Sequence, residues 1–104
     1  MEFIRWLGPD DRSRQKLTTE KGQVKRFVVQ YEAYIEGKWR AIVRYDTAHG
    51  YFHRDIIHPD RSTSKTEFSA VEFAEAFTQA ELDVKINWRR YRQNYFEEMR
   101  KWKT

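Results

Sequence analysis

Four ionisable residues near the middle of the chain have the side-chain types that acid–base chemistry requires. They lie within twelve consecutive positions: Arg44, Asp46, His53 and Asp55. An imidazole beside a carboxylate is held in one tautomer and titrates near neutral pH, and a neighbouring guanidinium can stabilise negative charge that develops on a phosphate. Ribonuclease chemistry without a metal needs only a base for the 2′-hydroxyl, an acid for the leaving oxygen and a cation for the phosphorane. We therefore take these residues as a candidate catalytic site.

The same four residues also have a purely structural interpretation. On two neighbouring strands, Arg44 would pair with Asp55, and Asp46 with His53, as ordinary cross-strand charge pairs. Each pair would contribute at most about 1 kcal/mol on an exposed sheet face. Ionisable residues with perturbed surroundings occur in structural networks as well as in active sites, so residue types alone leave both interpretations open.

The same segment contains donor atoms that metal sites use. Its imidazoles and carboxylates occur at His49, His53, Asp55, His58 and Asp60. Their spacing matches no fixed metal-binding motif such as HExxH, and His53 and His58 would lie on opposite sides of a regular strand. We therefore expect no metal ion and no other cofactor, with a site built from these donors as the alternative.

Several classes of protein are excluded by what the sequence lacks. The chain has no cysteine, so it offers no disulfide framework, no thiolate metal site and no thiol nucleophile. It has no glycine-rich phosphate loop, nucleophile elbow or dinucleotide fingerprint. No apolar run approaches the roughly 20 residues of a membrane span, and the charged N-terminal segment is too short for a signal sequence. We expect a soluble, cytoplasmic protein without a membrane partner.

Alternating apolar and polar residues predict the strands that position the candidate site. The alternation over residues 24–35 indicates a half-buried strand, and a three-residue turn at 36–38 matches apolar residues across the first hairpin. The opposed pairs in that register are Val29 with Tyr45, Tyr31 with Val43, Ala33 with Ala41 and Ile35 with Trp39. A one-residue slip would turn a whole apolar face to solvent, so the pattern itself selects the register.

A second turn at His49 and Gly50 predicts the hairpin that brings the candidate residues together. It places Val43 opposite Ile56 on the apolar face. The other face then receives two opposed pairs, Arg44 with Asp55 and Asp46 with His53. Pro59 ends the third strand, because proline cannot donate to a β-ladder. We therefore expect all four candidate residues on one face of the sheet.

A helical part is predicted over residues 69–102. Residues 69–72 form a capping box, and Phe68 and Phe73 are placed as its hydrophobic staple. One helical stripe follows, with apolar residues every three or four positions: Phe73, Phe77, Ala80, Val84, Trp88, Tyr91, Tyr95 and Met99. Asp83 and Asn87 are weak helix formers, so a kinked helix or two packed helices stay as alternatives to one straight helix.

These elements predict the architecture of the whole chain. A length of 104 residues is typical of one domain. We expect a single α+β domain over residues 1–104, with an irregular N-terminal arm at 1–23. A three-stranded antiparallel β-meander at 24–58 would then pack against the long C-terminal helix. Residues 8–23 have no sustained apolar period of either kind, which is why they are assigned to the arm.

Basic residues concentrate in the C-terminal helix. Twenty Lys and Arg against sixteen Asp and Glu give a net charge of +4, which permits nucleic-acid binding without requiring it. Residues 85–103 contain seven basic residues and two acidic ones. Arg89, Arg90 and Arg92 alternate with aromatic residues and are candidates for tracking a phosphate backbone while the rings stack on bases. The alternative is a core stripe of aromatics flanked by solvated charges.

The central hairpin carries a resemblance to known families. The residues concerned are the run Val43-Arg44-Tyr45-Asp46-Thr47-Ala48-His49-Gly50, followed by His53-Arg54-Asp55 and His58-Pro59-Asp60. From about Gly22 to the end, the chain resembles a family of small uncharacterised prokaryotic domains. More distantly, the hairpin is similar to TumE-type toxins of toxin–antitoxin pairs at Arg44, Tyr45, Asp46, Gly50, His53 and Arg54. This resemblance implies a toxin-like context, with a cognate antitoxin protein as partner, and it implies no particular reaction.

Our leading hypothesis from the sequence is a toxin-like component of a prokaryotic toxin–antitoxin or defence locus that acts on RNA. Arg44, Asp46, His53 and Asp55 would form its site, either as a metal-independent ribonuclease or without catalysis. One alternative is a non-enzymatic protein-binding module that uses the sheet face or the aromatic helix. Another is an accessory nucleic-acid-binding module that works through the basic helix. A homo-oligomer is compatible with each hypothesis.

Overall fold

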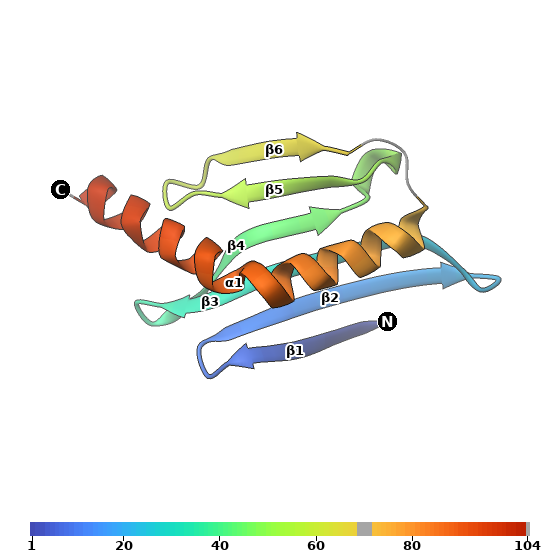
Figure 1. Cartoon of the computed structure of the whole chain (residues 1–104), viewed down its shortest axis with the longest axis horizontal. Helices are drawn as coiled ribbons and strands as arrows, with labels where there is room; N and C mark the ends of the chain where they lie inside the picture. Colours follow the sequence, from blue (N-terminus) through green and yellow to red (C-terminus); the bar gives the residue numbers. More distant parts are fainter. Residues whose placement is uncertain (69–71, 104) are drawn as a thin grey trace.

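The protein is a six-stranded antiparallel sheet with one long helix across one of its faces (Figure 1). The computed structural model describes residues 1–68 and 72–103, apart from the side chains of His49 and Lys103. The strands are neighbours in chain order: β1 (Glu2–Gly8), β2 (Asp11–Glu20), β3 (Gln23–Ile35), β4 (Lys38–Asp46), β5 (His53–Ile57) and β6 (Thr63–Glu67). A short 3-10 helix, η1 (Ala48–Gly50), joins β4 to β5, and α1 (Phe73–Lys103) follows β6.

The predicted α+β class and C-terminal helix are confirmed, but the sheet has six strands rather than three. The irregular arm predicted for residues 1–23 is wrong, because this segment forms β1 and β2. The first three inward side chains of β2 are polar, so the apolar alternation that indicates a strand is missing until Leu17: Asp11, Ser13 and Gln15 are all buried. Hydrogen bonds hold them instead: Tyr31 Oη–H donates to Asp11 and Gln15 Nε2–H donates to Ser13, while Gln15 Oε1 has no partner among the described residues.

Strand β6 was also outside the predicted meander at 24–58. All five of its residues are exposed, and none has an apolar side chain. A strand that buries nothing has no hydrophobic period, so only its backbone pairing with β5 defines it. The third predicted strand ends before Pro59 as expected, since β5 ends at Ile57.

The register of the first predicted hairpin is correct in its far half and wrong near its turn. Val29 opposes Tyr45 and Tyr31 opposes Val43, as predicted. The turn has two residues, both with positive φ angles (52° at Glu36 and 81° at Gly37), so Ala33 opposes Arg40 instead of Ala41. A bulge between the two halves leaves Ile42 without an opposed residue and restores the apolar pairing beyond it.

Helix α1 covers β3 and β4 and encloses the core. Its buried residues are Ala76, Ala80, Val84, Tyr91, Tyr95 and Met99, with Phe73, Phe77 and Trp88 partly buried against them. The predicted stripe is therefore confirmed as the face that packs on the sheet. Of the predicted capping box at 69–72, residues 69–71 lie outside the described part of the chain, and the described helix begins at Phe73, directly after Glu72.

The helix is continuous, so the alternative of two packed helices is wrong, and Figure 1 shows the helix bending near its middle. Asp83 accepts hydrogen bonds from the hydroxyls of Tyr45 and Tyr91 and from the side-chain amide of Asn87. Burial and the hydrogen bond to Asp83 raise the pKa of Tyr45, so the phenol stays a donor to this carboxylate. The tertiary contacts of Asp83 and Asn87 therefore offset their weak helix propensity. Within the described residues, no helix is both long and apolar enough to span a membrane.

Candidate functional site

The hairpin of β4 and β5 places the four candidate catalytic residues as the sequence predicts. Asp46 opposes His53 and Arg44 opposes Asp55, while Val43 opposes Ile56. Because Val43 belongs to the core beneath α1, the alternating residues of the same strands point to the other side of the sheet. We call that side the open face.

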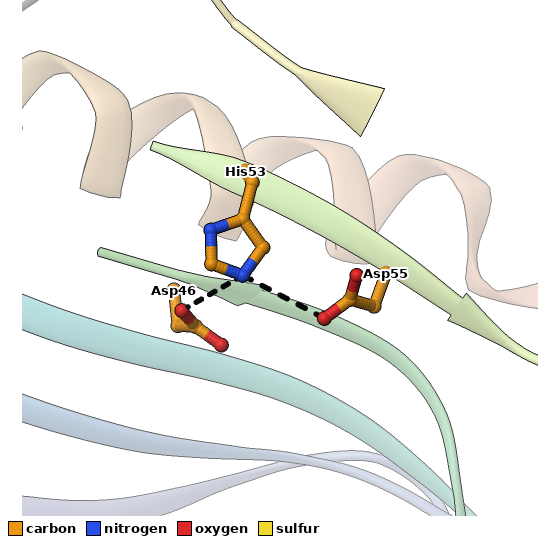
Figure 2. Close-up of side chains that lie close together, drawn as sticks. All are labelled: Asp46, His53 and Asp55. Carbon is orange, nitrogen blue, oxygen red and sulfur yellow. Dashed lines mark ion pairs between the residues drawn. The ribbon is translucent and has the colours of Figure 1, made fainter. Parts of the chain in front are cut away.

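Asp46, His53 and Asp55 converge on one another on the open face (Figure 2). The Nε2 atom of His53 lies 3.0 Å from Oδ1 of Asp46 and 3.6 Å from Oδ2 of Asp55. The ring of Tyr51 lies beside the imidazole, with 5.4 Å between ring centroids. His53 is only 2% exposed and Asp46 only 5%. The imidazole therefore faces two carboxylates and is closed to solvent.

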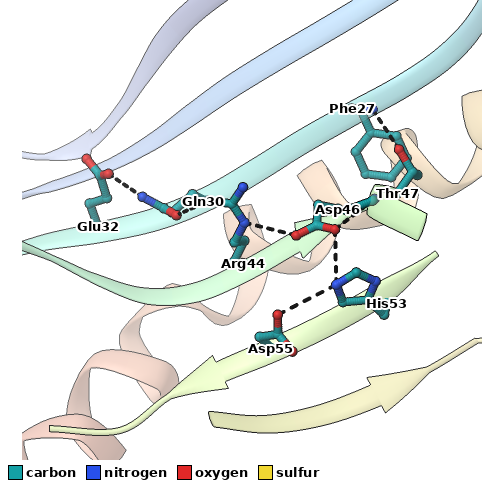
Figure 3. Close-up of polar contacts among 9 residues, drawn as sticks. Phe27, Gln30, Glu32, Arg44, Asp46, Thr47, His53 and Asp55 are labelled. Atoms are coloured by element: carbon teal, nitrogen blue, oxygen red, sulfur yellow. Dashed lines mark hydrogen bonds and ion pairs between the residues drawn. The ribbon is translucent and has the colours of Figure 1, made fainter. Parts of the chain in front are cut away.

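Arg44 is the exposed member of the set, with 42% of its side chain accessible. Its Nε–H donates to Asp46 Oδ2 (2.9 Å) and its Nη1 to Gln30 Oε1 (3.1 Å), as Figure 3 shows. The expected ion pair between Arg44 and Asp55 does not form, because the guanidinium turns toward its own strand and β3. Gln30 in turn donates to Glu32, so one row of polar contacts crosses β5, β4 and β3.

Asp46 is the centre of this row. Beyond Arg44 and His53, its Oδ1 accepts the backbone N–H of Ala48 (2.9 Å), which fixes the start of η1. The next residue, Thr47, accepts the backbone N–H of Phe27 through its hydroxyl (3.0 Å). Both contacts bind the β4–β5 loop to the sheet. The position of the Arg44 guanidinium is thus set by a buried carboxylate whose own place is fixed by the loop.

A cavity of about 360 Å³ opens beside Arg44. Its lining includes three basic side chains and one acidic one: Lys16, Arg26, Arg44 and Asp46. A second hollow of about 220 Å³ shares Lys16 and Arg44 and adds Arg14 and Glu2. We call Arg14, Lys16, Arg26 and Arg44 the basic stripe. Sequence reasoning missed its β2 members, although basic residues at every second position from Arg12 to Lys16 were a visible strand signal.

The donor atoms of Asp46, His53 and Asp55 lie within 4.8 Å of one another, a spacing that a divalent ion can draw together. The surroundings fit a metal poorly. A ligating histidine normally donates its other ring N–H to a neighbour, but Nδ1 of His53 is buried without a hydrogen-bond partner among the described residues. With the proton on Nε2 instead, the imidazole can donate to the carboxylates. This arrangement favours a hydrogen-bonded group over a metal centre.

The other donors considered from the sequence lie elsewhere. His58 contacts Glu98 of α1 through Nδ1 and Ser64 through Nε2, both at 2.7 Å, and so ties the β5–β6 turn to the helix. Hydrogen bonds from the hydroxyl and backbone N–H of Ser62 lower the pKa of Asp60, which caps the same turn. The side chain of His49 is outside the described residues.

The basic residues of α1 form no single site with the open face, because the helix lies on the opposite side of the sheet. Nε of Arg92 is 3.3 Å from a carboxylate oxygen of buried Asp11, which also accepts the hydroxyl of Tyr31. Arg92 therefore has a structural partner. Arg89 and Arg90 are exposed and stack on Trp88 and Tyr91, with 4.4 and 5.7 Å from guanidinium to ring centre.

Comparison with known proteins identifies a family and nothing closer. The chain matches no curated protein and no solved structure. One family model, described as a domain of unknown function (DUF7718), matches residues 1–101 and therefore includes β1 and β2 as well as the hairpin. The predicted resemblance to an uncharacterised domain family is confirmed at this level. The chain belongs to the DUF7718 family, an uncharacterised domain family.

Proposed function

We propose that this protein is a toxin-like component of a prokaryotic toxin–antitoxin or defence locus, and that it acts on RNA through the open face around Arg44. The observation that carries the proposal is the cavity beside Arg44, which has three basic side chains in its lining. The resemblance of the hairpin to TumE-type toxins supplies the toxin-like context, in which a cognate antitoxin would be the protein partner.

The charges at the cavity favour a phosphate ligand. Lys16 and Arg26 are exposed and form no ion pair within the described part of the chain. Arg44 has one carboxylate partner, Asp46, and that partner is buried and also bound by His53 and Ala48. The cavity therefore presents positive charge that the protein itself does not neutralise. Phosphate oxygens of a nucleic-acid backbone are ligands of matching charge.

The chemistry proposed at this site is transfer of the 2′-oxygen to phosphorus. A base removes the 2′-hydroxyl proton, the new oxygen–phosphorus bond forms, and the 5′-oxygen leaves with a proton from an acid. Arg44 would bind the phosphate, and Asp46 and His53 are the proton-transferring pair. His53 is 2% exposed, so this step also requires the β4–β5 loop to open.

The burial of His53 favours a second candidate function, which is RNA binding without cleavage. In that case Asp55, His53 and Asp46 act only to orient Arg44, and the protein is an accessory RNA-binding module. The two candidates share the same ligand and the same face. They differ in whether the wild-type protein cuts the RNA that it binds.

The test compares three variants that each remove one positive charge, two at the cavity and one control. Arg26 lines the cavity, whereas Lys25 lies beside the start of α1 on the other side of the sheet. We expect Arg44→Ala and Arg26→Ala to weaken binding of a labelled single-stranded RNA by about tenfold or more, and Lys25→Ala to leave it unchanged. Growth inhibition on expression should follow the same order. RNA binding and toxicity equal to those of the wild type in all three variants would refute the proposal.

A further inference from the structure

Three aromatic residues from three strands form a cluster on the open face, in which Trp39 is half-buried and the other two are exposed: Trp6, Tyr34 and Trp39. The ring of Trp39 lies 5.7 Å from that of Trp6 and 5.4 Å from that of Tyr34, measured between centroids. Trp6 is 61% exposed and Tyr34 is 43% exposed. We call these three residues the aromatic platform.

The hydrophobic core does not explain the platform. The core lies beneath α1, on the other face of the sheet. Trp39 has a structural role, because its ring stacks under the guanidinium of Arg12 at 3.9 Å, and Arg12 forms an ion pair with Glu32. Trp6 has no comparable role and keeps most of its surface in water. A contiguous group of exposed aromatics on a charged surface commonly marks a ligand-binding site.

The platform continues directly into the basic stripe. On β2, Arg12 is followed by Arg14 and Lys16 at every second position, so their Cα atoms are about 7 Å apart along the strand. Trp6 opposes Arg12 in the neighbouring strand β1. The side chain of Arg14 is 59% exposed, and Lys16 borders the cavity beside Arg44. Aromatic rings lie at one end of this track and cations at the other. Lys16 has no ion-pair partner among the described residues, whereas Arg14 lies 3.7 Å from a carboxylate oxygen of Glu32.

We infer that the open face binds single-stranded nucleic acid, with unpaired bases stacked on Trp6 and Tyr34 and phosphates along Arg14, Lys16 and Arg44. This inference rests on the proposed function and names its substrate class. Stacking requires a base whose flat surface is free, and such bases are available in single strands, loops and ends but not inside a duplex. The combination of a stacking surface with a positive groove is the usual arrangement of single-strand binding sites.

The experiment measures binding of labelled oligouridine RNA, alone and annealed to oligoadenine RNA, by fluorescence anisotropy. Trp6→Ala is compared with Trp102→Ala, because Trp102 is 62% exposed on α1 and so matches Trp6 in type and exposure. We expect Trp6→Ala to weaken binding of the single strand by about tenfold and to leave duplex binding unchanged. Trp102→Ala should change neither. Quenching of tryptophan fluorescence by the single strand should fall in Trp6→Ala.

The outcomes separate this inference from the proposed function. Loss of RNA binding in Arg44→Ala with unchanged binding in Trp6→Ala would overturn the platform and leave the proposed function standing. A protein that binds neither RNA would overturn both. Size-exclusion chromatography with light scattering completes the test. The wild type could be a dimer that binds no RNA, and Trp6→Ala could convert it to a monomer. That result would assign the platform to contact between copies and overturn the inference.

Discussion

At the scale of single residues, burial separates the group that can touch a ligand from the groups that position it. Arg44 is exposed, whereas Asp46 and His53 are almost completely enclosed. As half of a cross-strand charge pair on an exposed face, His53 would contribute at most about 1 kcal/mol, and alanine would be tolerated there. The burial of His53 means that alanine would leave a cavity, remove the imidazole that Asp55 faces, and leave Asp46 with only the donors from Arg44 and Ala48. His53→Ala would therefore confuse a stability effect with a functional one.

Glutamine is a better replacement for His53, because its amide still offers a hydrogen-bond donor and fills more of the space. If the protein cleaves RNA through His53, His53→Gln should bind RNA within about twofold of the wild type and lose cleavage. Urea unfolding of the variant provides the stability control. Unchanged cleavage by a folded His53→Gln protein would remove the imidazole from the chemistry. It would leave Arg44 as the functional group of the site.

At the scale of the elements, the hairpin that carries the site was predictable and its neighbours were not. In β4 and β5 the apolar pair of Val43 and Ile56 marks the inward face, and the alternation from it fixed the pairing of Asp46 with His53, although Arg54 also points inward and contacts Tyr91 of α1. In β2 the buried inward residues Asp11, Ser13 and Gln15 are polar, and in β6 no residue is buried. Because β2 was not recognised as a strand, the sequence did not reveal that the basic residues of the stripe lie on one face. Burial of the imidazole depends on the loop and on Tyr51, which pairing rules do not describe.

The β3–β4 turn explains the one error in register. Apolar matching favoured a three-residue loop, but Glu36 and Gly37 both adopt left-handed conformations, as in the two-residue turns that suit a twisted hairpin. The bulge at Ile42 then absorbs the mismatch. Turn geometry thus decided the pairing close to the turn, and apolar burial decided it farther away.

The same turn gives a test of backbone strain. Gly37 has a φ of 81°, and no atom lies within 4 Å of where a Cβ would stand. Gly37→Ala should therefore lower the free energy of unfolding by about 1 kcal/mol through its backbone conformation alone. Asparagine tolerates left-handed φ, so Gly37→Asn should cost less. Urea denaturation measures both. An asparagine variant less stable than the alanine variant would contradict the strain argument.

At the scale of the whole molecule, one face of the sheet packs the core and the other is available to a ligand. One face is sealed by α1 and holds the core, and the other bears the basic stripe and the aromatic platform. The molecule is elongated, with principal extents of 50 × 27 × 20 Å, so the open face is long relative to its width. A net charge of +4 is modest, but the four cations of the basic stripe lie on the open face and give a polyanion a defined track there.

The salt dependence of RNA binding measures how many cations of that track contact phosphates. For single strands, the slope of log K against log salt concentration is about −0.7 for each neutralised phosphate. Three or four contacts from the basic stripe predict a slope of roughly −2 to −3. Lys16→Ala should reduce its magnitude by about 0.7, whereas Lys25→Ala should not. A slope near zero for the wild type would mean that the stripe does not contact the backbone.

The unlike edges of the sheet carry a consequence for assembly. The β6 edge is short and wholly polar and includes Lys65, features that discourage a strand from another chain. The β1 edge is longer and contains Phe3, Ile4, Trp6 and Leu7. Two copies that joined through β1 would form one continuous sheet bounded on both sides by β6. Association along this route would therefore stop at a pair and could not propagate into a fibre.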